Sequence, residues 1–149
     1  MVFRGRLQRN PDPKGRIMLP PEFREILLFR SPTGQLALTT YDGCVAAFPL
    51  PEWEEFESRL SNVRSASRRL RDFRRQVLGG SVIVEPDSQG RIRLSQEQLD
   101  YAGISRDAIL VGQTSRFEVW SPERLNPIVT DSYDDVSQDL ADAGIDLLL

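Results

Sequence analysis

Two stretches, Asp12-Pro13-Lys14-Gly15-Arg16-Ile17-Met18-Leu19 and Asp87-Ser88-Gln89-Gly90-Arg91-Ile92-Arg93-Leu94, repeat one pattern 75 residues apart. Each has Asp at the first and Gly at the fourth position of a four-residue turn, which is the preference of a type I turn. An arginine follows each turn directly, Arg16 in the first and Arg91 in the second. The chain is therefore predicted to be a duplicated unit that presents two equivalent arginines.

The similarity extends outward from both turns. A short extended segment precedes each turn, a strand follows it, and a helix then begins, at Pro20-Pro21-Glu22 in the first half and at a Ser95-x-x-Gln98 capping box in the second. Two further strands close each half. The expected strands cover residues 3–7, 16–19, 36–39 and 45–48, and then 82–85, 91–94, 108–111 and 117–120.

Two helices are expected between the halves. The first begins at Pro51-Glu52-Trp53. The second covers residues 65–78, where apolar side chains at spacings of four, three and four form one stripe and arginines occupy the opposite side. The stripe consists of Ala66, Leu70, Phe73 and Val77, and the basic face of Arg64, Arg68, Arg71 and Arg75. This basic face is open to three interpretations, which are contact with solvent, with DNA or with a neighbouring subunit.

Charge is distributed unevenly along the 149 residues, although the net charge is only -3. Residues 1–80 hold 14 basic and 9 acidic side chains, whereas residues 81–149 hold 5 and 13. The segment from Asp131 to Leu149 contains no basic residue, and its acids are Asp131, Asp134, Asp135, Asp139, Asp142 and Asp146. Because a phosphate backbone responds to a local basic face rather than to the average charge, the overall acidity does not exclude a nucleic-acid partner.

The inventory of catalytic side chains is poor. The chain has no histidine, which removes the usual general base and the commonest metal ligand. Its single cysteine, Cys44, is expected to be a small buried residue rather than a nucleophile. No phosphate-binding loop motif is present either. We therefore expect no enzymatic activity, no catalytic residue, no cofactor, no bound metal and no small-molecule substrate.

Neither a membrane-spanning apolar run nor the apolar region of a signal peptide is found in the sequence. We therefore expect a cytoplasmic protein with no membrane partner.

Several short motifs, in this order along the chain, make the sequence similar to the MraZ family of bacterial transcriptional regulators, which are built from two AbrB-like (SpoVT-AbrB) repeats. The matching motifs are Phe3-Arg4-Gly5, Asp12-x-Lys14-Gly15-Arg16, Asp42-Gly43-Cys44, Pro51-Glu52-Trp53, Arg75-x-x-Leu78-Gly79, Asp87-x-x-Gly90-Arg91 and Leu110-Val111-Gly112-Gln113-x-x-Arg116-Phe117-Glu118-Val119-Trp120. One Asp-x-x-Gly-Arg motif alone would be weak, but two of them with the intervening Pro-Glu-Trp are quite specific.

This resemblance implies an α+β, mainly β fold: a pseudo-two-fold double-split β-barrel of AbrB-like swapped hairpins with flanking helices. Its implied organisation is a first repeat at 1–50, a helical connector at 51–80, a second repeat at 81–127 and an acidic tail at 128–149. It further implies a ring-shaped homo-oligomer, associated with the nucleoid, that binds double-stranded DNA. The implied target is a set of short G-containing direct repeats in the promoter of the division and cell-wall gene cluster, which includes the protein's own gene, with repression as the outcome.

The resemblance also assigns site residues. Arg16 and Arg91 correspond to the DNA-reading turn arginines, and Lys14, Arg4, Arg6 and Arg9 are candidates for contacts with the DNA backbone. Asp12, Gly15, Asp87 and Gly90 are expected to shape the turns. The second motif departs from the family pattern at Arg93 and Ser95, so the second half is expected to contact DNA differently. Each turn arginine could instead clamp its own turn by pairing with the aspartate.

A second class of function stays open. An AbrB-like fold could serve as a protein-interaction module, as in the antitoxin relatives, with the acidic tail binding a partner protein. The tail itself is open to three interpretations: a short docking helix, a disordered segment, or a shield over the basic face.

Overall fold

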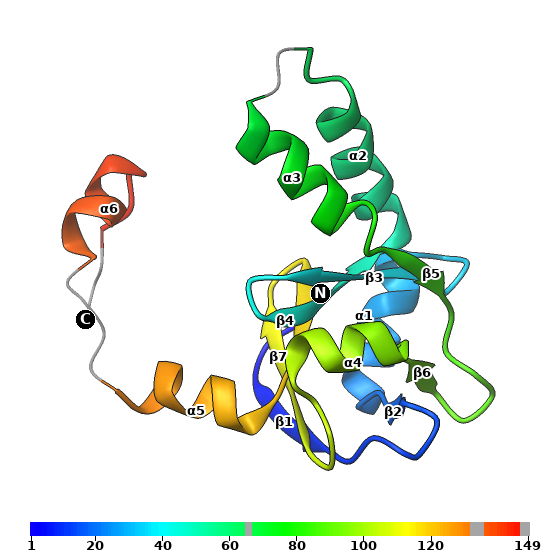
Figure 1. The fold of residues 1–149 in the computed structure, drawn as a ribbon. Helices are drawn as coiled ribbons and strands as arrows, with labels where there is room; N and C mark the ends of the chain where they lie inside the picture. The colour runs from blue at the N-terminus through cyan, green and yellow to red at the C-terminus, as the bar shows by residue number, and fades with distance from the viewer. Residues whose placement is uncertain (65–66, 132–135, 147–149) are drawn as a thin grey trace.

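The computed structural model describes residues 1–64, 67–131 and 136–146, in which strands and helices alternate along the chain (Figure 1). The first half contributes β1 (Arg6–Arg9), β2 (Arg16–Met18), α1 (Pro21–Arg30), β3 (Leu36–Tyr41) and β4 (Cys44–Pro49). The connecting helices are α2 (Leu50–Ser61) and α3 (Arg68–Val77). The second half contributes β5 (Val82–Val84), β6 (Arg91–Arg93), α4 (Gln96–Ala102), β7 (Ala108–Gln113) and β8 (Arg116–Trp120), followed by α5 (Pro122–Thr130) and α6 (Ser137–Asp142).

The two halves exchange strands. A six-stranded antiparallel sheet has the order β1-β7-β8-β4-β3-β5, and β2 and β6 pair as a separate antiparallel ribbon. Thus β1 of the first half pairs with β7 of the second, and β5 of the second pairs with β3 of the first. The α+β class with a mostly antiparallel sheet is confirmed. The described residues form no closed barrel, so the double-split barrel stays a prediction.

A pseudo-two-fold axis relates the halves. In the ribbon, Ile17 pairs with its own counterpart Ile92. At the centre of the sheet, Ala46 pairs with Glu118, its counterpart in the other half. Because a residue on a two-fold axis faces its own equivalent, the axis passes through both of these pairs.

The main core lies on one face of the sheet. Alternate residues of β3, β4, β7 and β8 point into it, as the two-residue period of a strand requires. Phe3, Phe23 and Phe117 pack there with ring centroids 5.2 Å apart in each pair. Ile17 and Ile92 are fully buried in the same core, so apolar packing holds the ribbon against the sheet and helices.

The opposite face of the sheet is covered by two smaller clusters. Trp53 of α2 and Val77 of α3 pack over Ala37, and the two helices form a hairpin on this side (Figure 1). Trp120 packs with Cys44 and with Leu125 of α5 in the second cluster. The helical connector therefore covers part of the face that the main core leaves open.

Most of the expected elements are present, with shifted ends. The capping box forms as predicted: Ser95 Oγ accepts from the Gln98 amide and Gln98 Oε1 accepts from the Ser95 amide, both at 3.1 Å. The first strand begins later than expected, since Gly5 has a φ of +91° and Phe3 makes only an isolated bridge with Thr114. The expected start of the second connecting helix was too early.

That second connecting helix is α3, which begins at Arg68. Ser67 is its N-cap and accepts a hydrogen bond from the Leu70 amide, because a serine hydroxyl can satisfy an unpaired amide of the first turn. Residues 65 and 66, including Ala66 of the predicted stripe, lie outside the described residues. The rest of the stripe is as predicted, with Val77 buried and Leu70 and Phe73 half-buried.

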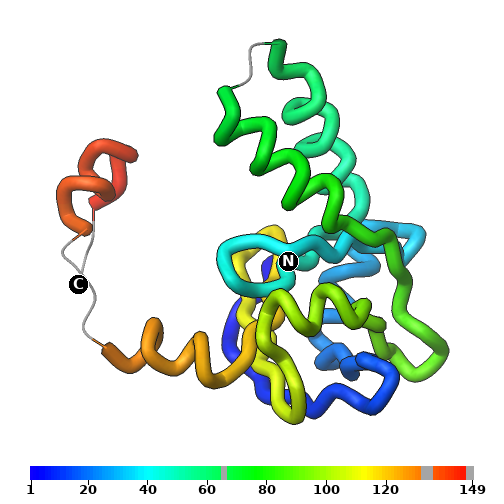
Figure 2. The backbone as a smooth tube through the Cα atoms, viewed as in Figure 1, coloured from blue at the N-terminus to red at the C-terminus, as the bar shows by residue number. Residues whose placement is uncertain are grey.

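Helix α5 begins against the sheet and leads away from it, and α6 lies apart from the body of the molecule (Figure 2). The acidic tail forms a helix at Ser137–Asp142, whereas Asp134, Asp135 and the terminal leucines 147–149 lie outside the described residues. Figure 1 shows α6 far from the β2–β6 ribbon, so within one copy the described tail does not cover the turns. None of the helices in the described ranges has the length and apolar character needed to cross a lipid bilayer.

Candidate nucleic-acid interface

The ribbon brings the two turns into one structure. Leu19 N donates to Gly90 O and Leu94 N donates to Gly15 O, each at 2.9 Å. Every turn is thus hydrogen-bonded to the strand that leaves the other turn. Gly15 approaches this partner so closely that a Cβ on it would lie 2.6 Å from Leu94 O. Two segments 75 residues apart in sequence are therefore joined by hydrogen bonds into a single unit.

Both turns have the same internal hydrogen bonds. In the first, Gly15 N donates to Asp12 O, and Asp12 Oδ1 accepts from the amides of Lys14 and Arg16, all at 2.9 Å. In the second, Gly90 N donates to Asp87 O, and Asp87 Oδ1 accepts from the amides of Gln89 and Arg91, again at 2.9 Å. One carboxylate oxygen therefore organises the backbone of each turn.

The other carboxylate oxygen holds the arginine. Asp12 Oδ2 accepts from Arg16 Nε at 2.6 Å, and Asp87 Oδ2 accepts from Arg91 Nε at 2.8 Å. Arg91 Nη1 also lies 4.0 Å from Asp12 Oδ2, which links the two turns electrostatically. We call these four residues, Asp12, Arg16, Asp87 and Arg91, the turn cluster.

The hydrogen bond to the aspartate engages Nε of each guanidinium and not its terminal amino groups, Nη1 and Nη2. The Arg16 and Arg91 side chains are 32% and 25% exposed. In the part of the chain that the structure describes, neither arginine donates a hydrogen bond from its Nη atoms. The clamping role, which the sequence left open, is thus compatible with binding a ligand through Nη1 and Nη2.

The aspartates of the turn cluster have lowered pKa values. Hydrogen bonding from the Arg16 backbone amide, followed by that from its side chain, lowers the pKa of Asp12 below its ordinary value of 3.8. The Arg91 amide and side chain lower the pKa of Asp87 in the same way. Both carboxylates are therefore ionised at neutral pH, which suits an anchor for arginine rather than a proton donor.

The other predicted contact residues lie at increasing distance from the ribbon along the first strand. Lys14 is exposed within the first turn, and Arg9 contacts the ribbon directly, with its Nε donating to Met18 O at 3.1 Å. Arg6 is exposed on β1, and the backbone of Arg4 packs against Gly112 of β7 beyond the far end of that strand. Contact with the ribbon is thus seen for Arg9 but not for Arg4.

Two further arginines adjoin the turns. Arg93 lies opposite Arg16 in the ribbon and donates from Nε to Lys14 O at 3.1 Å. Arg24 of α1 packs under the second turn, where its Cδ and Nη1 lie 2.5 Å from the position that a Cβ on Gly90 would take. In the first turn the corresponding neighbour of Gly15 is Leu99, which is apolar.

The role of Arg24 was missed at the sequence level. The sequence does contain a signal for this role. Arg24 and Leu99 are separated by the same 75 residues as the two turns, so they occupy equivalent positions, yet one is basic and the other is apolar. The two turns therefore differ in surroundings: Lys14 and Leu99 belong to the first, and Gln89 and Arg24 to the second.

Cys44 lies apart from this site. Its side chain is buried and its Sγ donates to Tyr41 O at 3.1 Å. Burial, followed by the nearby charges of Glu118 and Asp42, raises the pKa of the thiol well above its usual range. Cys44 is therefore a small buried residue, as the sequence predicts.

Comparison with known proteins places this geometry in a family. The family described as "MraZ protein, putative antitoxin-like" matches the chain twice, at residues 2–76 and 77–144. A protein of Nitratidesulfovibrio vulgaris (strain DSM 19637 / Miyazaki F) named "Transcriptional regulator MraZ" is 53% identical over 149 residues, covering all of both chains. Relatives with the same name in Oleidesulfovibrio alaskensis and Lactobacillus gasseri are 47% and 32% identical, covering 98% and 95% of this chain and 98% of each relative. The duplicated turns, the exchanged strands and these full-length similarities agree, and the chain belongs to the MraZ family.

Proposed function

We propose that this protein is a DNA-binding transcriptional regulator in which the turn cluster reads base edges. The observation that carries the proposal is the pairing of β2 with β6, which brings Arg16 and Arg91 into one unit and holds each by its own aspartate. The names of the full-length relatives support a role in transcription regulation.

Guanine is the base that fits this cluster best. An arginine can donate two parallel hydrogen bonds to O6 and N7 of guanine in the major groove, which discriminates against other bases by about 1–3 kcal/mol. An aspartate that fixes Nε also lowers the entropy that the side chain loses on binding. Lys14, Arg9, Arg6 and Arg4 would contact phosphates, which position a protein on DNA without reading sequence.

The family resemblance makes the proposal more specific. The protein would repress the division and cell-wall gene cluster, which includes its own gene, by binding short G-containing direct repeats. A double-split barrel with repeats at 1–50 and 81–127, assembled into a cytoplasmic, nucleoid-associated ring, would present several turn clusters at once. Because one cluster contacts few bases, linked copies would gain affinity by binding neighbouring repeats together.

A gel-shift titration against the DNA upstream of the protein's own gene tests this function. We expect Arg16→Ala and Arg91→Ala each to weaken binding by about tenfold or more, since each removes a guanine contact. Arg16→Lys keeps the charge but loses the paired donors, so we expect it to lose preference for the specific sequence more than total affinity.

Arg59→Ala is the matched control, because it removes an exposed arginine from α2 with the same change in charge. The titration is repeated at several salt concentrations, since phosphate contacts make affinity depend on salt. Equal, salt-insensitive binding by the wild type and both turn variants would contradict the proposed mechanism.

A protein-interaction module is the second candidate function, and exposed apolar residues support it. Ile128 and Val129, at the start of the acidic tail and in the last turns of α5, are 60% and 40% exposed. The family description also includes the words "antitoxin-like". If this were the main function, Arg16→Ala would leave both partner binding and nucleic-acid affinity unchanged.

A further inference from the structure

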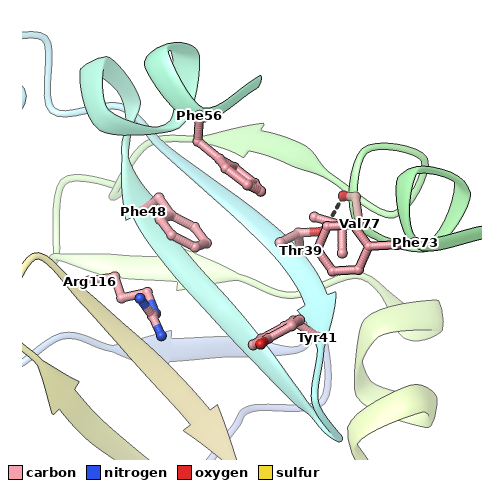
Figure 3. Close-up of a pocket in the computed structure, with 7 residues that line it drawn as sticks. All are labelled: Thr39, Tyr41, Phe48, Phe56, Phe73, Val77 and Arg116. Atoms are coloured by element: carbon pink, nitrogen blue, oxygen red, sulfur yellow. Dashed lines mark hydrogen bonds between the residues drawn. The ribbon is translucent and has the colours of Figure 1, made fainter. Parts of the chain in front are cut away.

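A pocket of about 240 Å³ lies between the sheet and the α2–α3 hairpin (Figure 3), and none of its lining residues belongs to the turn cluster. Aromatic side chains from four different elements surround it, namely Tyr41, Phe48, Phe56 and Phe73. Thr39 and Val77 close its inner side, where the Thr39 hydroxyl donates to the carbonyl of Val77 and joins β3 to α3.

The hairpin covers this face incompletely. Trp53 and Val77 are buried, but Phe48, Phe56 and Phe73 are only half-buried and Tyr41 is 39% exposed. Two pairs of these rings lie in contact: Phe48 stacks on Phe56 with the ring centroids 6.3 Å apart, and Tyr41 meets Phe73 edge-on at the same distance. A formed opening lined by aromatic rings is typical of a binding site for a small apolar group.

Arg116 adds a positive charge to this apolar opening. Its guanidinium lies 5.6 Å from the centre of the Phe48 ring, and its Nε is shielded from solvent with no hydrogen-bond partner in the described residues. Within the same ranges no carboxylate lies at ion-pair distance from it. Glu118, the next residue on the same face of β8, instead accepts from Trp120 Nε1 at 3.0 Å. A buried guanidinium nitrogen without a partner costs free energy that an anion at this position would recover.

We infer that this pocket binds a small carboxylate with an aromatic body. The carboxylate would pair with Arg116, which presents planar donors suited to it, and the ring would pack among the aromatic side chains. The volume of about 240 Å³ is below that of pockets for drug-sized ligands and favours a compound with a single ring. This site is independent of the proposed DNA function, because it shares no residue with the turn cluster.

Binding of 3-phenylpropionate to the full chain tests the inference, with the neutral 3-phenylpropanamide as the matched ligand. Titration calorimetry should show the acid binding about tenfold or more tightly than the amide, as expected for a charge-assisted hydrogen bond. Arg116→Gln should remove this preference, and Phe56→Ala should weaken both ligands. Arg69→Gln, which removes an exposed charge from α3, should bind both like the wild type.

Three results would overturn the inference. They are equal affinity of the wild type for acid and amide, unchanged affinity of Arg116→Gln for the acid, and no binding of either ligand at about 1 mM. The comparison of the two ligands on the wild type needs no variant. It therefore tests the inferred carboxylate preference even if a substitution impairs folding. Since no DNA is present in these titrations, their outcome is separate from that of the gel shift.

Discussion

At the scale of single residues, the two turn glycines are equivalent in sequence but meet different neighbours. Both have left-handed backbones, with φ of +79° at Gly15 and +80° at Gly90. A Cβ on Gly15 would collide with a backbone carbonyl, that of Leu94, whereas one on Gly90 would meet the flexible side chain of Arg24. A side chain can move aside at lower cost than a strand.

We therefore expect Gly15→Ala to destabilise the protein more than Gly90→Ala. Both substitutions incur about 1–2 kcal/mol for a left-handed alanine, and Gly15→Ala must in addition displace the ribbon. Urea unfolding of the two variants measures the difference in free energy. Equal losses of unfolding free energy in the two variants would show that the close approach of Gly15 to Leu94 adds nothing to the cost of an alanine at residue 15.

The turn aspartates predict a dependence of stability on pH. Their pKa values are lowered in the folded state, so the unfolded chain binds more protons as the pH falls to the ordinary value of 3.8 and below. Their contribution to stability is therefore complete above that pH and is lost as the pH falls through the folded-state values. We expect the double variant Asp12→Asn, Asp87→Asn to lose less stability than the wild type over this acid range.

Chemical unfolding of both proteins from neutral pH to below 3.8 measures this difference in slope. Because other carboxylates titrate in both proteins, only the difference reports on the turns. Identical slopes would mean that the hydrogen bonds to these two carboxylates do not persist in solution.

At the scale of elements, Gln98 connects helix α4 to the sheet. It is buried, and its Nε2 donates to Leu38 O at 3.0 Å and to Gly80 O at 3.3 Å, while its Oε1 completes the capping box. One side chain thus joins α4, β3 and the segment that leads into β5.

We expect Gln98→Leu to cost about 1–3 kcal/mol, because it leaves buried polar groups without partners. Gln96→Leu is the control on the same helix, where the exposed Gln96 side chain donates to Asp100 Oδ1, and it should change stability by less than about 0.5 kcal/mol. Thermal unfolding of the two variants gives the comparison. A small effect of both would contradict a linking role for Gln98.

Local elements could be predicted from the sequence because their causes are local. The capping box at Ser95 and the turns at Asp12 and Asp87 are specified by side chains within four residues of each other. The continuous apolar run of β4 likewise indicates a strand, and both of its faces are covered in the structure. The family resemblance supplied the idea of swapped hairpins.

Contacts between distant segments could not be derived from the residues. The period of a strand specifies which residues share a face but not which strand lies beside it, so the pairing of β1 with β7 needed the structure. The same holds for Arg24 beneath Gly90 and for Arg116 beside Phe48, since each contact depends on the final packing of a helix or strand.

At the scale of the whole molecule, strand exchange makes the halves depend on each other. In the first half, β1 pairs with β7 and β2 with β6, and in the second half β5 pairs with β3; within the described residues none of these three strands pairs with a strand of its own half. We expect fragments 1–80 and 81–149 to be largely unfolded when separate and to fold when mixed. Circular dichroism of each fragment and of the equimolar mixture measures this. Native-like signal from either fragment alone would contradict the expectation.

The inequality of the two turns gives the molecule a polarity. A perfect two-fold repeat would look the same from either direction along a DNA duplex and would suit palindromic sites. Lys14 and Leu99 at one turn, against Gln89 and Arg24 at the other, remove that equivalence. A bound copy would then have a head and a tail, and successive copies on direct repeats would all point the same way. Duplication thus supplies the paired shape, and divergence of the copies supplies its direction.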